Sequence, residues 1–138
     1  MNRFRAIIDH IPSGILSGIT VILILWLTLA PNPTGDLELP LFPGADKVVH
    51  ALMFAFLTFI VLLELMRNAK WETLSLVKIG AAALCCSVFG VIIELIQQAM
   101  GLGRSFEILD ILADSAGSFA MGGVWAAFQQ VLANHSDD

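Results

Sequence analysis

The chain has 138 residues, of which 57% are hydrophobic and 14% are charged, and its formal net charge at pH 7 is −5. A soluble domain carries about 25% charged residues, so this composition excludes a domain surrounded by water and indicates a small protein with several membrane spans. The sequence has no basic patch of the kind that binds nucleic acid, so we expect no nucleic acid among its partners.

Four apolar runs predict an all-α fold, a four-helix transmembrane bundle that forms one domain over residues 1–138. A span needs about 20 apolar residues to cross a hydrocarbon core of about 30 Å. The first run is also longer than the apolar part of a signal peptide, about 7–15 residues, so we expect a retained helix. The predicted spans are residues 11–30, 48–66, 79–100 and 108–132.

Lysine and arginine residues gather on one side of the predicted bundle. Five lie in the N-terminal segment and the second connection, and two lie in the first and third connections. By the positive-inside rule, this distribution predicts that both termini are cytoplasmic. The five are Arg3, Arg5, Arg67, Lys70 and Lys78, and the two are Lys47 and Arg104.

Polar residues are predicted to converge at the outer side of the bundle, at the ends of three spans. An ionisable group at membrane depth costs roughly 2.5–3.5 kcal/mol on insertion scales, so such groups usually pair inside the protein. Asp46 and His50 are four residues apart, as are Asp110 and Asp114, so each pair shares a helix face. The predicted binding residues are Asp46, Lys47, His50, Glu94, Gln97, Arg104, Ser105, Asp110 and Asp114.

The fourth span is rich in small residues, among them Ala113, Gly117, Ser118, Gly122 and Gly123. Small residues four apart allow two helices to approach closely in lipid. We therefore expect this span to pack tightly against another helix, either within the chain or in a helix-mediated oligomer.

The order of these motifs resembles the VanZ-like family over about residues 12 to 130. The motifs are Asp46-Lys47-x-x-His50, Glu94-x-x-Gln97, Arg104-Ser105, and Asp110-x-x-x-Asp114-x-x-Gly117. Asp114 departs from the family pattern, which usually has asparagine there, and Phe54 stands where an aromatic residue with a hydroxyl is common. The family is named for a protein that gives low-level resistance to the glycopeptide teicoplanin. The resemblance implies a multi-pass protein of the bacterial cytoplasmic (inner) membrane with a role in the cell envelope, and it implies no particular reaction.

The predicted polar pocket suits the anionic headgroup of a membrane lipid or of a lipid-linked cell-envelope intermediate. Arg104, Lys47 and His50 would hold the phosphate, while the acyl chains stay among the spans. In an enzymatic version of this hypothesis, His50 or Glu94 acts as a general acid or base.

Two alternatives remain open. In the first, the cluster is a structural network in which Arg104 pairs with Glu94 or Asp114, and His50 pairs with Asp46 or Asp110. In the second, the acids form a proton or ion relay. A relay needs an acid near the other side of the membrane, and Glu64 is the candidate, although we expect it to be a residue whose carboxylate reaches to the cytoplasmic boundary.

We expect no cofactor and no metal ion. A metal site built from His50, Asp46, Asp110 and Asp114 has suitable ligand types. It would depend on a single histidine, and the sequence contains no recognised metal-binding spacing.

Overall fold

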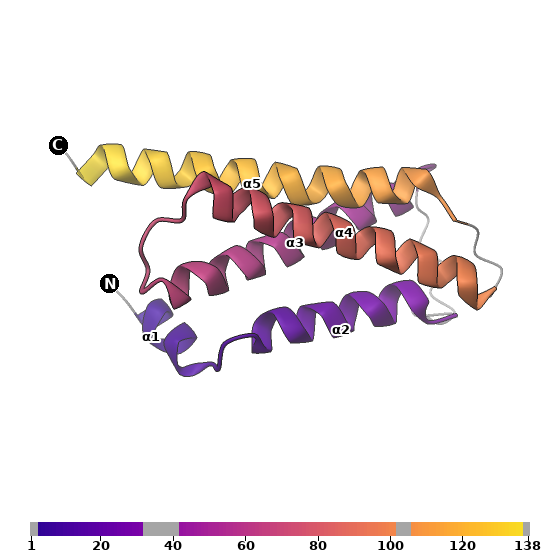
Figure 1. Cartoon of the computed structure of the whole chain (residues 1–138), viewed down its shortest axis with the longest axis horizontal. Helices are drawn as coiled ribbons and strands as arrows, with labels where there is room; N and C mark the ends of the chain where they lie inside the picture. Colours follow the sequence, from indigo (N-terminus) through magenta and orange to yellow (C-terminus); the bar gives the residue numbers. More distant parts are fainter. Residues whose placement is uncertain (1–2, 32–41, 102–105, 137–138) are drawn as a thin grey trace.

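The computed structural model describes residues 3–31, 42–101 and 106–136. Within these ranges the chain forms five α-helices and no strand, which confirms the all-α prediction. Figure 1 shows α2 to α5 running side by side along the long axis, with both termini at the same end. The helices are α1 (Arg3–His10), α2 (Ile15–Leu29), α3 (Ala45–Asn68), α4 (Leu76–Met100) and α5 (Ile108–Ser136).

Three helices, α3, α4 and α5, are each long and apolar enough to cross a membrane. The helix α2 has 15 residues and is too short to qualify alone, but together with α1 it passes as one span bent by 75°. The described residues therefore contain three candidate spans, or four if the bent pair counts as one. The prediction of four spans stays a prediction.

The predicted first span begins too early, because residues 11–14 form a break between α1 and α2. Pro12 has no backbone N–H to donate to a helix, and Gly14 has φ of 85°, a left-handed conformation that favours glycine. The helix α1, which has only eight residues and equal numbers of apolar and polar ones, was not predicted at all.

Glu64 of α3 caps the beginning of α2. The residue is buried, and its carboxylate accepts hydrogen bonds from the backbone N–H groups of Gly14 (3.1 Å) and Leu16 (3.2 Å) and from the Ser17 hydroxyl. The first N–H groups of a helix have no partner within the helix, and a carboxylate there is also stabilised by the helix dipole. The prediction that Glu64 reaches out to the membrane boundary is therefore wrong.

We expect Glu64→Ala to destabilise the fold by about 1.5–3 kcal/mol, the usual contribution of a hydrogen bond to a charged group. The reason is that the substitution leaves donors at the start of α2 without an acceptor. Thermal unfolding in detergent measures the effect, with Glu72→Ala as the control because Glu72 is exposed. Equal stability of the two variants would show that α2 does not need this cap.

The small residues of α5 permit close contact with α3 and α4. A Cβ atom built on Gly117 would lie 2.7 Å from the backbone carbonyl carbon of Ala51 in α3, so only glycine fits there. A Cβ atom on Gly122 would lie 3.4 Å from Ile79 in α4, whereas one on Gly123 would meet nothing within 4 Å. The predicted close packing is thus confirmed within the chain at Gly117 and Gly122.

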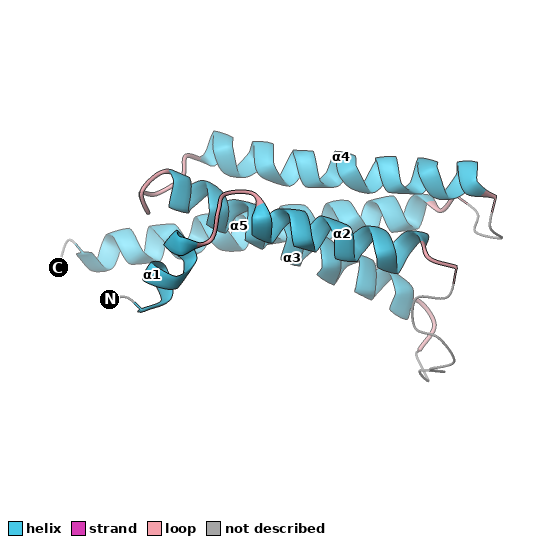
Figure 2. Cartoon of the chain, turned by 90° about the horizontal axis from the view of Figure 1, so that it is seen from below, coloured by secondary structure: helices cyan, strands magenta, loops and turns pink. Residues whose placement is uncertain are grey.

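Two groups of buried apolar side chains lie between the helices, while many large apolar side chains point outward. Figure 2 shows the helices from a second side. Ile22 is 68% exposed, Leu52 65% and Val124 61%, so α2, α3 and α5 all present apolar surface outside the core. Such surface is expected of helices that face lipid. The core groups are Leu62, Leu63, Leu74, Ile79, Ala82 and Trp125, and Ile24, Phe54, Leu57, Cys86 and Ile93.

Candidate functional site

The polar residues gather at the end of the bundle opposite the termini. There α3 begins, α4 ends and α5 begins (Figure 1). The site therefore draws its side chains from three helices that are far apart in the sequence. Of the nine predicted binding residues, seven lie in the described part of the chain. Arg104 and Ser105 lie outside the described residues, so the predicted pairs between Arg104 and the acids Glu94 and Asp114 do too.

Lys47 lies among three carboxylates. Its ammonium is 2.7 Å from Asp46 Oδ2 and 2.5 Å from Asp110 Oδ1, and it also contacts Glu107 Oε2. The side chains of Asp46 and Glu107 are 60% and 48% exposed, whereas that of Asp110 is 13% exposed. Lys47 thus links the exposed rim of the cluster to its interior. Glu107 was not predicted, although its position three residues before Asp110, one helical turn away, was a usable signal.

His50 lies deeper, between two acids of α5. Its Nδ1 is 2.9 Å from Asp114 Oδ1, and its Nε2 is 3.8 Å from Asp110 Oδ2. The second distance is too long for a hydrogen bond. Of the two predicted partners, Asp110 is within ion-pair distance, whereas the hydrogen-bond partner is Asp114, which is 1% exposed and was not predicted as a partner.

Asp114 is held against the backbone of α4. A Cβ atom on Gly90 would lie 2.9 Å from Asp114 Cβ and 2.6 Å from its Oδ2, so the close approach requires glycine at position 90. Asp114 Oδ2 is buried without a hydrogen-bond partner in the described part of the chain, as is Ser118 Oγ one turn further along α5. The α4 backbone therefore fixes the position of the carboxylate that binds His50.

Glu94 is fully buried near the end of α4. Its Oε2 accepts a hydrogen bond from the backbone N–H of Glu107 (3.2 Å), just before α5 begins, while its Oε1 has no hydrogen-bond partner among the described residues. Gln97, one turn later, donates through Nε2 to the backbone oxygen of Thr28 (2.7 Å). Glu94 thus faces α5, and Gln97 ties α4 to the end of α2.

The described part of the cluster carries more negative than positive charge. Lys47 is its only lysine or arginine, and His50 is its only histidine, against five carboxylates. Burying an ionised carboxylate without a compensating charge is costly. Lys47 beside Asp110 and His50 beside Asp114 reduce that cost. The five are Asp46, Glu94, Glu107, Asp110 and Asp114.

Two groups of side chains have ligand atoms close enough to share a metal ion. His50, Glu94 and Asp110 form one group, and Asp46, Glu107 and Asp110 form the other, with all ligand atoms in a group within 4.8 Å of one another. The second group surrounds the Lys47 ammonium, which already supplies a positive charge. The metal site considered from the sequence drew its ligands from α3 and α5 and lacked Glu94, which comes from α4.

Comparison with protein-family models matches residues 11–129 to VanZ/LLP1. The match includes every predicted site residue and most of the chain, in agreement with the resemblance noted over residues 12 to 130. No curated protein and no solved structure matches the chain. On the family match, together with the long apolar helices, this chain belongs to the VanZ/LLP1 family.

Proposed function

We propose that this protein is a multi-pass protein of the bacterial cytoplasmic membrane that binds the anionic headgroup of a lipid or of a lipid-linked cell-envelope intermediate. Both termini are cytoplasmic, and the cluster around Lys47 lies near the outer leaflet. The link to low-level glycopeptide resistance rests on the family resemblance, and the binding of a headgroup rests on the surroundings of Lys47.

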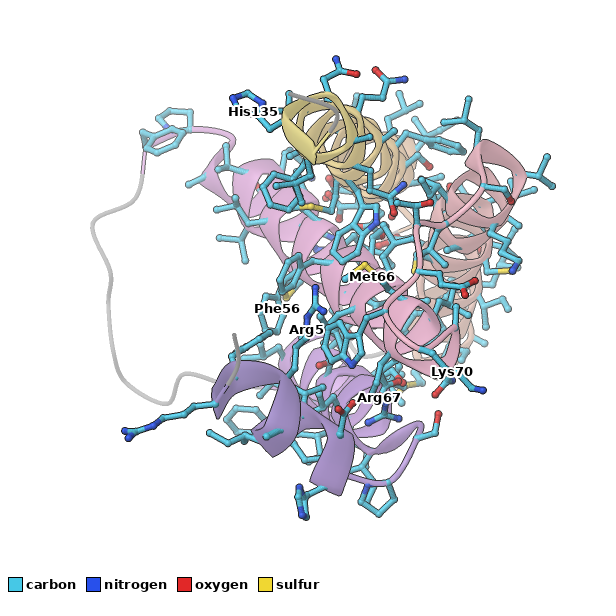
Figure 3. The ribbon with its side chains drawn as sticks, turned by 90° about the vertical axis from the view of Figure 1, so that its left-hand side faces the viewer. Arg5, Phe56, Met66, Arg67, Lys70 and His135 are labelled. Atoms are coloured by element: carbon cyan, nitrogen blue, oxygen red, sulfur yellow. The ribbon has the colours of Figure 1, made fainter. Side chains whose placement is uncertain are left out.

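The distribution of basic side chains supports this orientation. Figure 3 looks onto the end of the molecule that carries the termini, where Arg5, Arg67 and Lys70 are labelled. Arg5 lies over the Trp71 ring, 5.1 Å from its centroid. An excess of arginine and lysine is typical of the cytoplasmic side of a membrane protein, and tryptophan is typical of either membrane interface.

The binding proposal rests on the contacts of the Lys47 ammonium with three carboxylates. Two of its three carboxylate partners, Asp46 and Glu107, are at the exposed rim and so can move away at little cost in packing. A phosphate group is negatively charged, as a carboxylate is, and it also accepts hydrogen bonds from an ammonium group. A headgroup phosphate would therefore replace the rim carboxylates on Lys47, while the buried Asp110 keeps the lysine in place.

We expect Lys47→Met to weaken binding of phosphatidylglycerol and of a polyprenyl phosphate about tenfold or more. A hydrogen bond to a charged group contributes about 1.5–3 kcal/mol, and 1.4 kcal/mol corresponds to about a tenfold change. Native mass spectrometry of the protein released from nanodiscs, with phosphatidylcholine as the neutral reference lipid, measures the difference. In a susceptible bacterium, expression of the wild type should raise the inhibitory concentration of teicoplanin, and Lys47→Met should not.

Lys78→Met is the matched control, because Lys78 is an exposed lysine at the other end of α4. It should bind both lipids as the wild type does. If phosphatidylcholine binds as well as the anionic lipids, or if the two lysine variants behave alike, the headgroup proposal fails.

A structural network is the second candidate, and the buried pair of His50 and Asp114 favours it. This pair joins α3 to α5 where Gly90 and Gly117 let three helices approach closely. A relay has less support. Glu64, the acid on which it depends, is engaged as a helix cap.

A further inference from the structure

We propose that His50, Glu94 and Asp110 bind one divalent transition-metal ion, such as Zn²⁺ or Mn²⁺. This proposal is separate from the proposed binding of a headgroup, because all the named ligands of the ion are side chains of the protein and no lipid is needed to hold it. The three side chains come from α4, from the second turn of α3 and from the first turn of α5, and their ligand atoms lie within 4.8 Å of one another.

The hydrogen bond of His50 leaves one ring nitrogen free for a metal. Asp114, when ionised, can only accept, so the proton of the His50–Asp114 bond lies on Nδ1. In the neutral imidazole the lone pair is then on Nε2, which faces Asp110 Oδ2 at 3.8 Å. With bonds of about 2.0–2.2 Å, two ligands of a tetrahedral zinc ion lie about 3.4 Å apart, so a small adjustment brings both atoms onto one ion.

Glu94 supplies the independent observation that points to a ligand. Its side chain is fully buried, its Oε2 is oriented by the Glu107 backbone N–H, and its Oε1 has no hydrogen-bond partner in the part of the chain that the structure describes. A buried polar atom is normally satisfied. A metal ion shared with His50 and Asp110 would satisfy this oxygen and balance the charge of two acids.

The neighbours of the three ligands resemble the outer partners of known metal sites. Histidine ligands usually donate their other N–H to a carboxylate, as His50 does to Asp114, and carboxylate ligands are themselves held by other groups. Asp110 uses Oδ1 for Lys47, which leaves Oδ2 directed at His50. One histidine and two carboxylates suit zinc, manganese or ferrous iron better than magnesium or calcium, which prefer oxygen ligands alone. They also leave positions on the ion for water or another ligand.

The test is a titration of the purified, chelator-treated full chain in detergent with Co²⁺, followed by its visible absorption, and with Zn²⁺ by calorimetry. We expect one ion per chain. Glu94→Gln and Asp110→Asn should each weaken binding tenfold or more, because each removes a charged ligand. Asp114→Asn should weaken it less, because the asparagine oxygen can still accept the His50 Nδ1 proton.

His135→Ala and Glu72→Gln are the controls, since both residues are exposed and lie away from the site. Each should bind the ion as the wild type does. If a ligand variant fails to fold, the wild type alone still tests the metal site. A bound ion should give a Co²⁺ absorption spectrum, and Zn²⁺ should raise the unfolding temperature. No bound ion in the wild type, or equal binding in Glu94→Gln, overturns the metal site. Neither result would change the outcome of the lipid-binding test, because that test compares Lys47→Met with Lys78→Met.

Discussion

Gly117→Ala is expected to destabilise the protein by about 3 kcal/mol or more, the upper part of the range for overpacked sites. The new Cβ atom would lie 2.7 Å from the carbonyl carbon and 2.9 Å from the Cα of Ala51, and both are backbone atoms that no side-chain rotation can move away. The helices α3 and α5 must therefore separate. The thermal unfolding midpoint in detergent and the yield of monodisperse protein measure the loss.

Gly123→Ala is the matched control on the same helix. Its Cβ atom would meet nothing within 4 Å, and alanine is favoured over glycine within a helix by about 0.5–1 kcal/mol. This variant should be as stable as the wild type or slightly more stable. If the two variants unfold at the same temperature, α3 and α5 do not approach as closely at Gly117 as described.

His50→Ala is the second change with a large expected effect. It removes the hydrogen-bond donor of Asp114, which is 1% exposed, and leaving a buried polar group without its partner costs about 1–3 kcal/mol, more for a charged group. Thermal unfolding in detergent again measures the change, and His135→Ala, at an exposed histidine near the end of α5, should leave the unfolding temperature unaltered.

A double substitution separates the cost of a buried charge from the loss of packing. His50→Ala combined with Asp114→Asn should be more stable than His50→Ala alone, because no uncompensated carboxylate remains. Strictly additive effects would mean that the two side chains do not interact. If His50→Ala is as stable as the wild type, the pair does not hold α3 to α5 and the structural alternative is lost.

Hydropathy predicted the interiors of α3, α4 and α5 well, because the apolar runs are long and scarcely interrupted. It placed the beginning of α3 three residues late, at Val48 instead of Ala45. The helix starts with Asp46 and Lys47 in its first turn, and hydropathy measures compatibility with lipid rather than the hydrogen bonding that defines a helix. The same limitation explains why α1 was missed and why the first span began at Ile11.

The pairings within the cluster were harder to predict than its members. Helical spacing places Asp46 with His50, and Asp110 with Asp114, but the rotation of each helix depends on how closely its neighbours approach. The glycine at position 90 allows Asp114 to lie against α4 and from there to reach His50. The role of Glu64 left no signal in the spacing at all, because its partners are backbone N–H groups of another helix.

The joint between α1 and α2 has a consequence for the depth of α2 in the bilayer. Glu64 binds the start of α2, and Arg67, one turn later on α3, donates to the carbonyl oxygens of Ile8 in α1 and of Ile11 just after it. A helix of 15 residues spans about 22 Å at 1.5 Å per residue, less than a hydrocarbon core of about 30 Å. If α1 and α2 together form a fourth span, α3 holds α2 at this joint so that α2 cannot slide along the bilayer normal. We would then expect the bilayer to be thinner along that flank of the protein.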